Sequence, residues 1–416
     1  MPRCSFRGIS LSMYLTHLSL TNFRNFTRLD VDFPRGPLLL VGSNAQGKTS
    51  LLEAIYYLAT FVSFHAGSDR ELINFLAGRE PLAVTRIVAD FQRDVARRRI
   101  EVRVIQEPNG FNGPRVRKEV LLDGVKQKIS EVVGVFNAVL FLPQMLRVVE
   151  GSPEERRRYL NLAIAQIYPH YAQALVEYSR ILSQRNALLK QLAEWSGDLS
   201  QLNFWDEQLA ETGSRIIFTR IHALQELERL GVGLHQELTR GQEVFRLVYQ
   251  PSFDPMPIRP NQYRLPLDAP VDRSMLSLEK IRPSFQENLL RTRNEDISRG
   301  VTTTGPHRDE FRFLSNGVDL GVYGSRGQVR TAMLSLKLAE VAWMKEKTHE
   351  WPVLLLDEVL AELDDQRRQD LLSRLAQSEQ SFLTTTDLDL FNEAFISQAK
   401  LWNVQMGRLQ EMNHES

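Results

Sequence analysis

The sequence contains almost none of the features that mark secreted or membrane proteins. It has one cysteine, Cys4, which excludes a disulfide within the chain and is typical of a reducing compartment. No apolar run approaches the roughly 18 residues of a membrane span, and the N-terminus lacks the long apolar core of a secretory signal. We therefore expect a cytoplasmic protein with no membrane partner. The first strand-like stretch begins at Met13, so we expect Met13 as the natural start.

A charge imbalance is also lacking, because 51 Lys and Arg residues face 51 Asp and Glu residues. With 43% apolar and 25% charged residues, the composition is that of an ordinary globular protein. Neither internal repeats nor low-complexity tracts are present. The length allows about two to three domains. A nucleic-acid site, if the chain has one, must therefore be local.

The chain does have a phosphate-binding loop of the G-x-x-x-x-G-K-S/T type at residues 42–49. Apolar residues 37–41 predict a buried strand before it, and the spacing over 50–58 predicts a helix after it. Such a loop turns backbone N–H groups onto phosphate oxygens, and the helix dipole adds positive potential. Lys48 should reach the β- and γ-phosphates, and the Thr49 hydroxyl should hold Mg²⁺. The residues expected to contact the nucleotide are Gly42, Ser43, Asn44, Ala45, Gln46, Gly47, Lys48 and Thr49.

Two carboxylates follow the apolar run at 352–356, which predicts a buried strand ending in Asp357 and Glu358. The carboxyl ends of parallel strands line the crevice where such sheets bind ligands. We expect Asp357 to orient Mg²⁺ opposite Thr49, and Glu358 to polarise the attacking water as a general base. The segment between the two halves of this site must be an insertion into one nucleotide-binding domain.

A second glycine-containing loop, Tyr323–Gln328, opens a helix predicted over 329–347. Its free N–H groups, its helix dipole and the Ser325 hydroxyl form an anion site by the same logic; a helix N-cap without a ligand is the alternative. One chain would then hold one full site and one half-site. The simplest arrangement is two facing chains, in which Ser325 of one binds the γ-phosphate held by Lys48 of the other.

Further strands are predicted around the phosphate loop. Residues 14–33 predict two strands joined by a turn with Arg24 and Asn25, which is either a polar hairpin tip or a nucleotide contact. Three strands over 84–91, 99–105 and 116–122 predict an appended antiparallel sheet. This sheet is basic, which indicates either a solvated face or a footprint for a phosphate backbone. Its basic residues are Arg93, Arg97, Arg98, Arg99, Arg103, Arg115, Arg117, Lys118, Lys126 and Lys128.

The middle of the chain is predicted to be largely helical over 153–248. Ser152, Pro153 and Glu155 form a helix start with a capping box. The three arginines at 156–158 oppose the dipole of that helix, so an anionic partner is one explanation for them. Leucine spacing on both sides of a loop at 196–197 predicts an α-hairpin lobe rather than an extended coiled coil. Prolines at 251–270 mark a linker, and a further helix is predicted over 276–299.

Taken together, the loop at 42–49, the loop at 323–328 and the run at 356–364 resemble the ATPase head of SMC-like ABC proteins. Within that group, the chain resembles the RecF family over residues 13–410. The closer resemblance rests on residues 20–25, 151–161, 304–309 and 362–364. It implies an α/β P-loop ATPase head, with a mixed sheet and an appended antiparallel sheet, interrupted by a helical hairpin lobe. The implied domains are 13–150 for the first half of the head, 151–299 for the inserted lobe and 300–410 for the second half.

The resemblance also implies an activity and partners. RecF-like proteins are slow ATPases that bind ATP and Mg²⁺, form an ATP-dependent homodimer and clamp gapped or junctional DNA. With RecR and RecO they help load RecA during replication, repair and the SOS response. By residue, the resemblance implies catalytic roles for Lys48, Asp357, Glu358 and Ser325, nucleotide contacts for Arg24, Asn25, Gly327 and Gln328, metal contacts for Thr49, Asp357 and Gln144, and a dimer contact for Asp364.

Two positions depart from the family pattern. Gln144 occupies a position where the family usually has an acidic residue. In other ABC heads, a glutamine contacts the metal ion and the water. The position before Asp387 lacks the switch histidine of ABC proteins, and Thr385 or Thr386 is expected to replace it.

Three other functions fit parts of the sequence. A transporter ATPase subunit, or a subunit of another SMC-like machine, would share the head, but the helical lobe and the turn at 20–25 argue against a transporter. A small-molecule kinase would share the phosphate loop but leaves the helix at 328–347 without a role. A scaffold that binds ATP only structurally would show no turnover dependent on Glu358.

Overall fold

The structure is a computed structural model that describes residues 12–109, 114–195, 197–256 and 271–412. Cys4 and most of the proline-rich linker predicted at 251–270 lie outside the described residues. The chain forms two compact units, one from residues 1–143 and 344–416 and the other from residues 144–343. The inserted segment predicted at 151–299 lies within the second unit, which also contains the loop Tyr323–Gln328.

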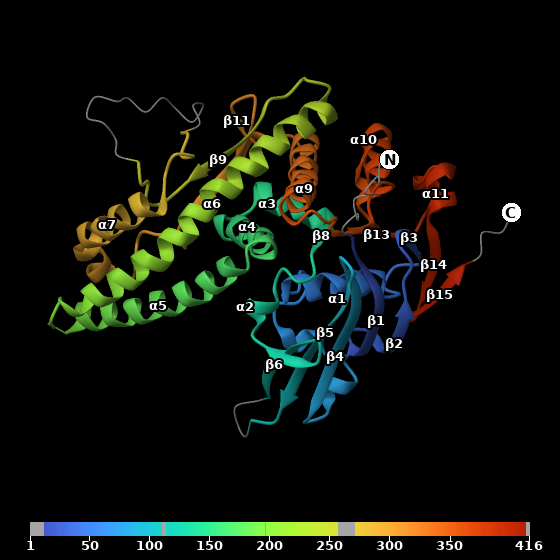
Figure 1. Cartoon of the computed structure of the whole chain (residues 1–416), viewed down its shortest axis with the longest axis horizontal. Coiled ribbons are helices and arrows are strands. Elements are labelled where there is room, and N and C mark those ends of the chain that lie inside the picture. The colour runs from blue at the N-terminus through green and yellow to red at the C-terminus, as the bar shows by residue number, and fades with distance from the viewer. Residues whose placement is uncertain (1–11, 110–113, 196, 257–270, 413–416) are drawn as a thin grey trace, which may run out of the picture. The chain divides into compact units, whose positions relative to one another are not determined.

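The first unit contains a six-stranded sheet in the order β15-β14-β3-β13-β12-β8 (Figure 1). All of its neighbouring strands are parallel except β14 and β15. Strands β3 and β12 are largely continuous apolar runs, as expected for strands with both faces buried. Every residue of β12 and β13 is buried, although β13 also contains Gln, Ser and Thr residues. The strands are β3 (Gly36–Val41), β8 (Ala138–Phe141), β12 (Val353–Asp357), β13 (Gln380–Thr385), β14 (Lys400–Gln405) and β15 (Arg408–Met412). The parallel pairing brings the carboxyl ends of β3, β12 and β13 to one edge.

A second six-stranded sheet of the first unit has the order β2-β1-β4-β5-β6-β7 and is antiparallel throughout. It confirms the predicted antiparallel sheet. The turn after its strand β6 lies at Asp123 and Gly124, where both φ angles are positive. The N-terminal hairpin forms part of this sheet, which was not predicted. The strands are β1 (Met13–Phe23), β2 (Phe26–Asp32), β4 (Ala83–Arg93), β5 (Ala96–Glu107), β6 (Arg115–Leu122) and β7 (Val125–Gln127).

The first unit also contains several helices, and the buried side-chain amide of Gln380 links its two sheets. Gln380 of β13 accepts a hydrogen bond from Leu15 N at 2.8 Å and donates one to Leu15 O at 2.9 Å, so it joins the two sheets. The helices are α1 (Lys48–Thr60), η1 (Asp69–Leu72), η2 (Ala77–Arg79), α2 (Ile129–Val132), η5 (Val359–Glu362), α10 (Asp365–Leu375), η6 (Leu388–Leu390) and α11 (Glu393–Gln398). Another short helix, η4 (Pro143–Leu146), lies at the end of this segment of the chain.

The basic residues of the antiparallel sheet are largely paired with acids on the same sheet. Asp90 accepts from Arg97 at 2.9 Å and from Arg99 at 2.5 Å, and these charges hold the pKa of the Asp90 carboxyl below its usual value. Glu101 is similarly paired with Arg86 and Arg103. Glu119 binds Arg117 and Lys126. This pairing favours a solvated sheet face over a footprint for a phosphate backbone.

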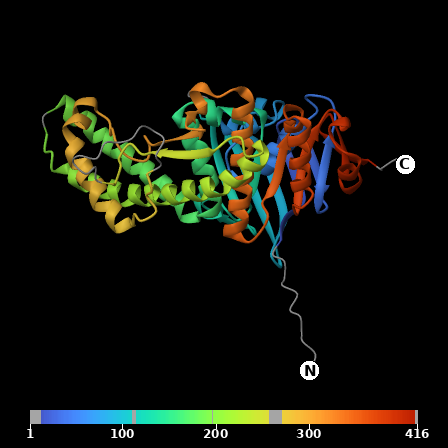
Figure 2. The same ribbon diagram turned by 90° about the horizontal axis from the view of Figure 1, so that it is seen from above.

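The second unit is mainly helical. Its helices α5 and α6 are antiparallel, and α7 packs against both, as Figures 1 and 2 show from two directions. The predicted hairpin is thus present but has a third helix. The elements are α3 (Arg147–Glu150), α4 (Pro153–Ile167), α5 (Pro169–Glu194), α6 (Gln201–Thr239), β9 (Phe245–Gln250), α7 (Leu278–Arg299), β10 (Glu310–Ser315), β11 (Val318–Asp319) and α8 (Leu320–Tyr323). Helix α9 (Arg326–Thr348) begins in this unit and ends in the first.

The structure corrects one end of the predicted helical segment. Helix α6 ends at Thr239, and residues 245–250 form β9 rather than helix. The alternation of buried Phe245, Leu247 and Tyr249 with more exposed neighbours has the period of two that suits a strand paired to β10. The capping box of Ser152 and Glu155 and the end of α7 before Gly300 agree with the predictions.

A buried ion-pair network holds the three long helices together. Arg185 of α5 has no exposed surface and donates to Asp206 of α6 at 2.7 Å and to Asp296 of α7 at 2.8 Å. Arg293 adds a second contact to Asp206 at 2.5 Å. Removing one partner of such a buried pair leaves an unpaired charge and costs about 3–5 kcal/mol. The network therefore fixes the relative positions of the helices.

Candidate nucleotide site

The phosphate loop lies between β3 and α1, as the sequence predicts. Gly47 has φ 115°, which favours glycine, and a Cβ at this position would lie 2.6 Å from Nδ2 of Asn25. A Cβ at Gly42 would lie 2.4 Å from the carbonyl oxygen of Val404. Glycine is therefore needed at both positions, because the β1–β2 turn and strand β14 press directly against the loop.

The Lys48 side chain lies inside the loop and is almost completely buried, with 4% of its surface exposed. Its Nζ donates to Gly42 O at 2.6 Å and to Ser43 O at 3.2 Å. The same Nζ lies 3.2 Å from Oε1 of Glu358. The ammonium group thus sits between the loop carbonyls and the carboxylate that the sequence predicts as the general base.

The Asp357 carboxylate joins β12 to the start of α1. It accepts hydrogen bonds from the Thr49 hydroxyl at 2.9 and 3.0 Å and from the Thr384 hydroxyl at 2.7 Å. Burial raises the pKa of Asp357, while the hydrogen bonds from both threonines act in the opposite direction. A carboxylate beside a hydroxyl is a donor set that fits Mg²⁺. Within the described ranges, no group of three or more His, Cys, Asp or Glu residues could hold a metal ion.

The neighbouring acid, Glu358, has a different environment because the backbone turns there. Its φ of 52° lies in the left-handed region, which costs about 1 kcal/mol or more for a residue other than glycine. Its N–H donates to the Thr384 hydroxyl at 3.0 Å, which holds this conformation. The side chain is 43% exposed and contacts Lys48, whereas Asp357 is buried. Nothing in the sequence indicates this positive φ.

Thr384 is a site residue that was not predicted. Parallel pairing of β12 and β13 places it opposite Asp357, and its hydroxyl contacts both acidic residues. Thr385, which was expected to replace the switch histidine, instead has its hydroxyl bonded to the backbone of Asp387. Thr386 is exposed beyond the end of the strand, and its role stays a prediction. Thr384 could have been predicted only from the register between β12 and β13.

Replacing Thr384 by Val should lower ATP turnover by about tenfold, because the change keeps the shape but removes the hydroxyl that orients Asp357 and Glu358. The free energy of unfolding should fall by about 1–3 kcal/mol, since a buried carboxylate loses a donor. Steady-state phosphate release and thermal unfolding measure the two effects. Thr384→Ser, which retains the hydroxyl, serves as the control. Equal turnover in the Val and Ser variants would contradict a role for the hydroxyl.

The turn between β1 and β2 packs against the loop and against α1. Asn25 Nδ2 donates to Gln46 O at 3.2 Å. The Arg24 guanidinium binds both carboxylate oxygens of the buried Glu53 at 2.7 and 2.8 Å, and it also binds Glu71 O. Arg24 therefore fixes the turn on the helix. That Arg24 and Asn25 touch the nucleotide stays a prediction.

The signature loop, Tyr323–Gln328, lies in the second unit. The hydroxyl of Ser325 accepts from Gln328 N at 3.3 Å, and the side chain of Gln328 accepts from Ser325 N at 3.0 Å. This is the reciprocal pattern of a capping box. Ser325 and Gly327 are exposed, and Val322 and Tyr323 beside them expose 60% and 77% of their surfaces. The start of α9 thus presents exposed apolar side chains beside a capped helix N-terminus.

Two other predicted site residues lie on short elements. Gln144 is exposed on η4, directly after β8. Asp364 caps α10, and its carboxylate accepts from Arg367 N at 2.9 Å. Their predicted roles toward metal and dimer remain predictions.

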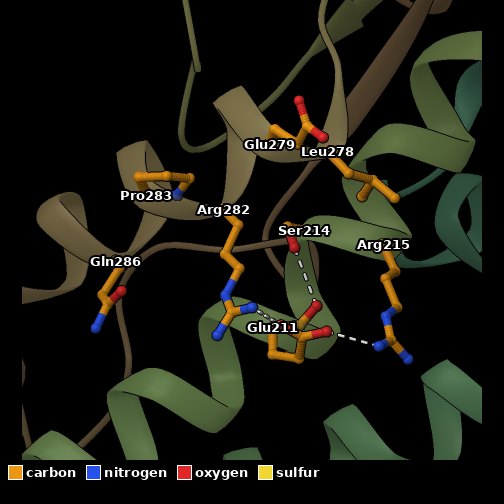
Figure 3. A pocket seen from close by; sticks show the side chains of 8 residues that line it. All are labelled: Glu211, Ser214, Arg215, Leu278, Glu279, Arg282, Pro283 and Gln286. Atoms are coloured by element: carbon orange, nitrogen blue, oxygen red, sulfur yellow. Dashed lines mark hydrogen bonds and ion pairs between the residues drawn. The ribbon is translucent and has the colours of Figure 1, made fainter.

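A groove of about 500 Å³ lies in the second unit between α6 and α7. Figure 3 shows its two arginines, Arg215 and Arg282, turned toward Glu211, with which they pair at 2.6 and 2.5 Å. Ser214 donates to the carbonyl oxygen of the same glutamate at 3.0 Å. Since Glu279 also lines the groove, its two arginines are balanced by two glutamates, and it offers no excess charge to a ligand.

Among the helices in the described part of the chain, none has the length and hydropathy needed to cross a membrane.

Comparison with known proteins gives the family. A family model described as the RecF/RecN/SMC N terminal domain matches residues 14–411. The DNA replication and repair protein RecF of Roseiflexus castenholzii is 39% identical over 411 residues, which cover 95% of this chain and 99% of that protein. The protein of the same name from Bacillus subtilis is 36% identical over 403 residues, which cover 95% of this chain and 100% of that protein.

Solved structures agree with this result. The recombination mediator protein RecF, solved with ATP, gives a TM-score of 0.81 at 32% identity and covers 97% of this chain and 100% of that one. An Smc head domain from Pyrococcus furiosus gives a TM-score of 0.51 at 18% identity, over 96% of each chain, which shows the shared fold alone. The chain therefore has the α/β fold of an SMC-like ABC ATPase head and belongs to the RecF family of DNA replication and repair proteins.

Proposed function

We propose that the protein is a slow ATPase of replication and recombinational repair whose ATP-dependent homodimer clamps gapped or junctional DNA. The observation that carries the proposal is the convergence of Lys48, Thr49, Asp357 and Glu358 at one edge of the parallel sheet. These residues come from segments more than 300 positions apart in the chain. Their side chains have the chemistry that phosphoryl transfer to water requires.

In the proposed reaction, Lys48 binds the phosphates of ATP, and Thr49 and Asp357 hold Mg²⁺, with Gln144 as a further contact. When bound, Mg²⁺ neutralises charge that develops on the phosphate oxygens. Without nucleotide, the ammonium of Lys48 contacts Glu358. A γ-phosphate bound in the loop replaces Glu358 as the partner of this ammonium. The Glu358 carboxylate is then free to accept a proton from the attacking water. Thr384 keeps the backbone of Glu358 in place for this step.

The signature loop supports a second chain as the partner. Ser325, Gly327 and Gln328 lie at the N-terminus of α9, where the helix dipole and the Ser325 hydroxyl favour an anion, and the exposed Val322 and Tyr323 offer apolar surface for docking. In the proposed dimer each γ-phosphate binds Lys48 of one chain and Ser325 of the other. Hydrolysis removes the shared charge and opens the dimer.

The wider assignment rests on the relatives. Solved RecF structures are described as belonging to the RecFOR pathway, which supports RecR and RecO as partners and RecA as the downstream protein. We place the protein in the cytoplasm, with DNA as its binding partner. The division into head halves at 13–150 and 300–410 and an inserted lobe at 151–299 is part of the same proposal.

Binding to gapped, single-stranded and duplex DNA, measured by gel shift with and without ATP, tests the proposal. We expect ATP to strengthen binding to gapped DNA, and affinity to fall steeply with salt because phosphate contacts release counterions. DNA should also increase ADP release. The Lys48→Ala variant is the control, because it should lose the ATP effect alone. Turnover that is insensitive to DNA, together with no gel shift, would indicate an ATPase of another machine.

A further inference from the structure

Three residues of the second unit converge on a buried carboxylate in the turn before β10. Asp309 is 2% exposed and accepts hydrogen bonds from the hydroxyl of Tyr249 at 2.5 Å and from Ser252 N at 2.9 Å. Arg220 of α6 lies 3.3 Å from the same carboxylate. Burial raises the pKa of Asp309, while the charge of Arg220 and the hydrogen bonds from Tyr249 and Ser252 act in the opposite direction. The turn is therefore rigidly held, and its buried acid is paired with Arg220.

Arg220 is the buried centre of this cluster. Only 3% of its side chain is exposed, and it donates to Pro306 O at 2.5 Å, Asn161 at 3.0 Å and the hydroxyl of Tyr171 at 3.0 Å. His307 adds no charge near neutral pH, because burial lowers its pKa to about 4. The guanidinium of Arg220 is thus fixed beneath the turn as a permanent positive charge.

Two further arginines lie at the surface above this charge. Arg157, in the second turn of α4, is partly buried and donates to the backbone carbonyl of Asp309 at 2.9 Å. Arg308 is exposed on the turn itself. Within the described ranges, neither has a carboxylate at ion-pair distance. Burial is the main cause that lowers the pKa of Arg157, and the positive charges of Arg220 and Arg308 lower it further. Three guanidinium groups therefore share one neighbourhood with incomplete compensation.

This arrangement differs from the other arginine-rich surfaces of the protein. On the antiparallel sheet, Asp90, Glu101 and Glu119 each form ion pairs with two cations. In the groove between α6 and α7, Glu211 forms ion pairs with both Arg215 and Arg282. Among the described residues, Arg157 and Arg308 have no such ion pair, although the charges of Glu154 and Asp309 act on Arg157 from a greater distance. The planar guanidinium fork matches the oxygens of a phosphate group.

We propose that Arg157 and Arg308 form a phosphate-binding site on the second unit, which takes a backbone phosphate of DNA. The choice of DNA over free phosphate rests on the proposed function; the chemistry of the site fits both. Arg308 exposes the site to solvent. The buried residues Arg220 and Asp309 fix the turn that carries Arg308. The site is built from residues of the second unit alone, whereas Lys48 and Glu358 belong to the first.

The test compares three variants that each remove one positive charge: Arg308→Gln, Arg157→Gln and, as the matched control in the same unit, Arg215→Gln. Fluorescence anisotropy with a gapped oligonucleotide, over a series of salt concentrations, measures affinity. We expect Arg308→Gln and Arg157→Gln to weaken binding by roughly tenfold and to reduce the slope of log affinity against log salt by about one. The Arg215→Gln variant should match the unchanged protein, and ATP turnover without DNA should be the same in all.

One further variant and two further measurements distinguish the possible outcomes. Arg157→Lys retains the charge without the fork and should bind DNA with intermediate affinity, while melting temperatures show that each variant is folded. Unchanged affinity and salt slope for both Arg157→Gln and Arg308→Gln, with the original protein binding DNA, would overturn this site and leave the proposed function standing. If inorganic phosphate raises the melting temperature of the original protein but not of these variants, and DNA affinity is unchanged, the site takes free phosphate instead. Absence of DNA binding by the original protein would overturn both proposals.

Discussion

Replacing Glu358 by Gln should reduce ATP turnover by about 10²–10⁴-fold while ATP still binds, because the amide cannot accept the proton of the attacking water. The change is nearly isosteric, so the left-handed backbone at this position and its hydrogen bond to Thr384 should persist. Since hydrolysis would no longer open the dimer, light scattering should show dimers that form with ATP and remain.

Glu393→Gln is the matched control for this prediction, because Glu393 is an exposed glutamate at the start of α11 in the same unit. It should leave both turnover and the monomer–dimer equilibrium unchanged. Normal turnover in Glu358→Gln would show that another group acts as the base. A variant that stays monomeric at saturating ATP would contradict the ATP-dependent dimer.

Replacing Ser325 by Arg should abolish dimer formation and reduce hydrolysis to background, while each chain still binds ATP through its phosphate loop. Ser325 is exposed at the start of α9, so the monomer can accommodate the larger side chain. The long cationic side chain would nevertheless block the approach of a phosphate held by another chain. Light scattering with ATP, nucleotide binding by fluorescence and phosphate release measure the three parts of this prediction.

A mixing experiment decides whether Ser325 acts on its own chain or on a partner. Chains with Ser325→Ala, which leaves the docking surface open, are mixed with chains carrying Lys48→Ala. In a facing dimer of the two, one site combines an intact Lys48 with an intact Ser325. Turnover above the sum of the separate variants supports the arrangement across two chains. No gain on mixing, while mixed dimers are detected, would place Ser325 outside the partner's site.

The sequence predicts most of this fold because its strongest signals are local. The loop at 42–49, the apolar run before Asp357 and the cap at Ser152 each depend on neighbouring residues. Strand β9 was predicted as helix because the leucine pattern of α6 precedes it closely and masks its alternation.

Tertiary contacts explain what could not be predicted in the candidate site. Thr384 matters because of the register between β12 and β13, which no pattern within either strand reveals. Glu53 reads as part of an ordinary amphipathic helix, yet it is the buried partner of Arg24. The surface of Arg157 and Arg308 likewise depends on α4 and the turn before β10 meeting in space.

The contact between Lys48 and Glu358 also has an energetic consequence. Because Glu358 is 43% exposed, the ion pair is screened by water and contributes only about 0.2–1 kcal/mol. Breaking it therefore weakens the apparent affinity for ATP by no more than about fivefold. In the nucleotide-free protein, the contact keeps the Glu358 carboxylate beside the loop. Breaking the contact costs little free energy compared with that gained when ATP binds. The ion pair should thus have only a small effect on ATP affinity, and Glu358→Gln should bind ATP only slightly more tightly than the original protein.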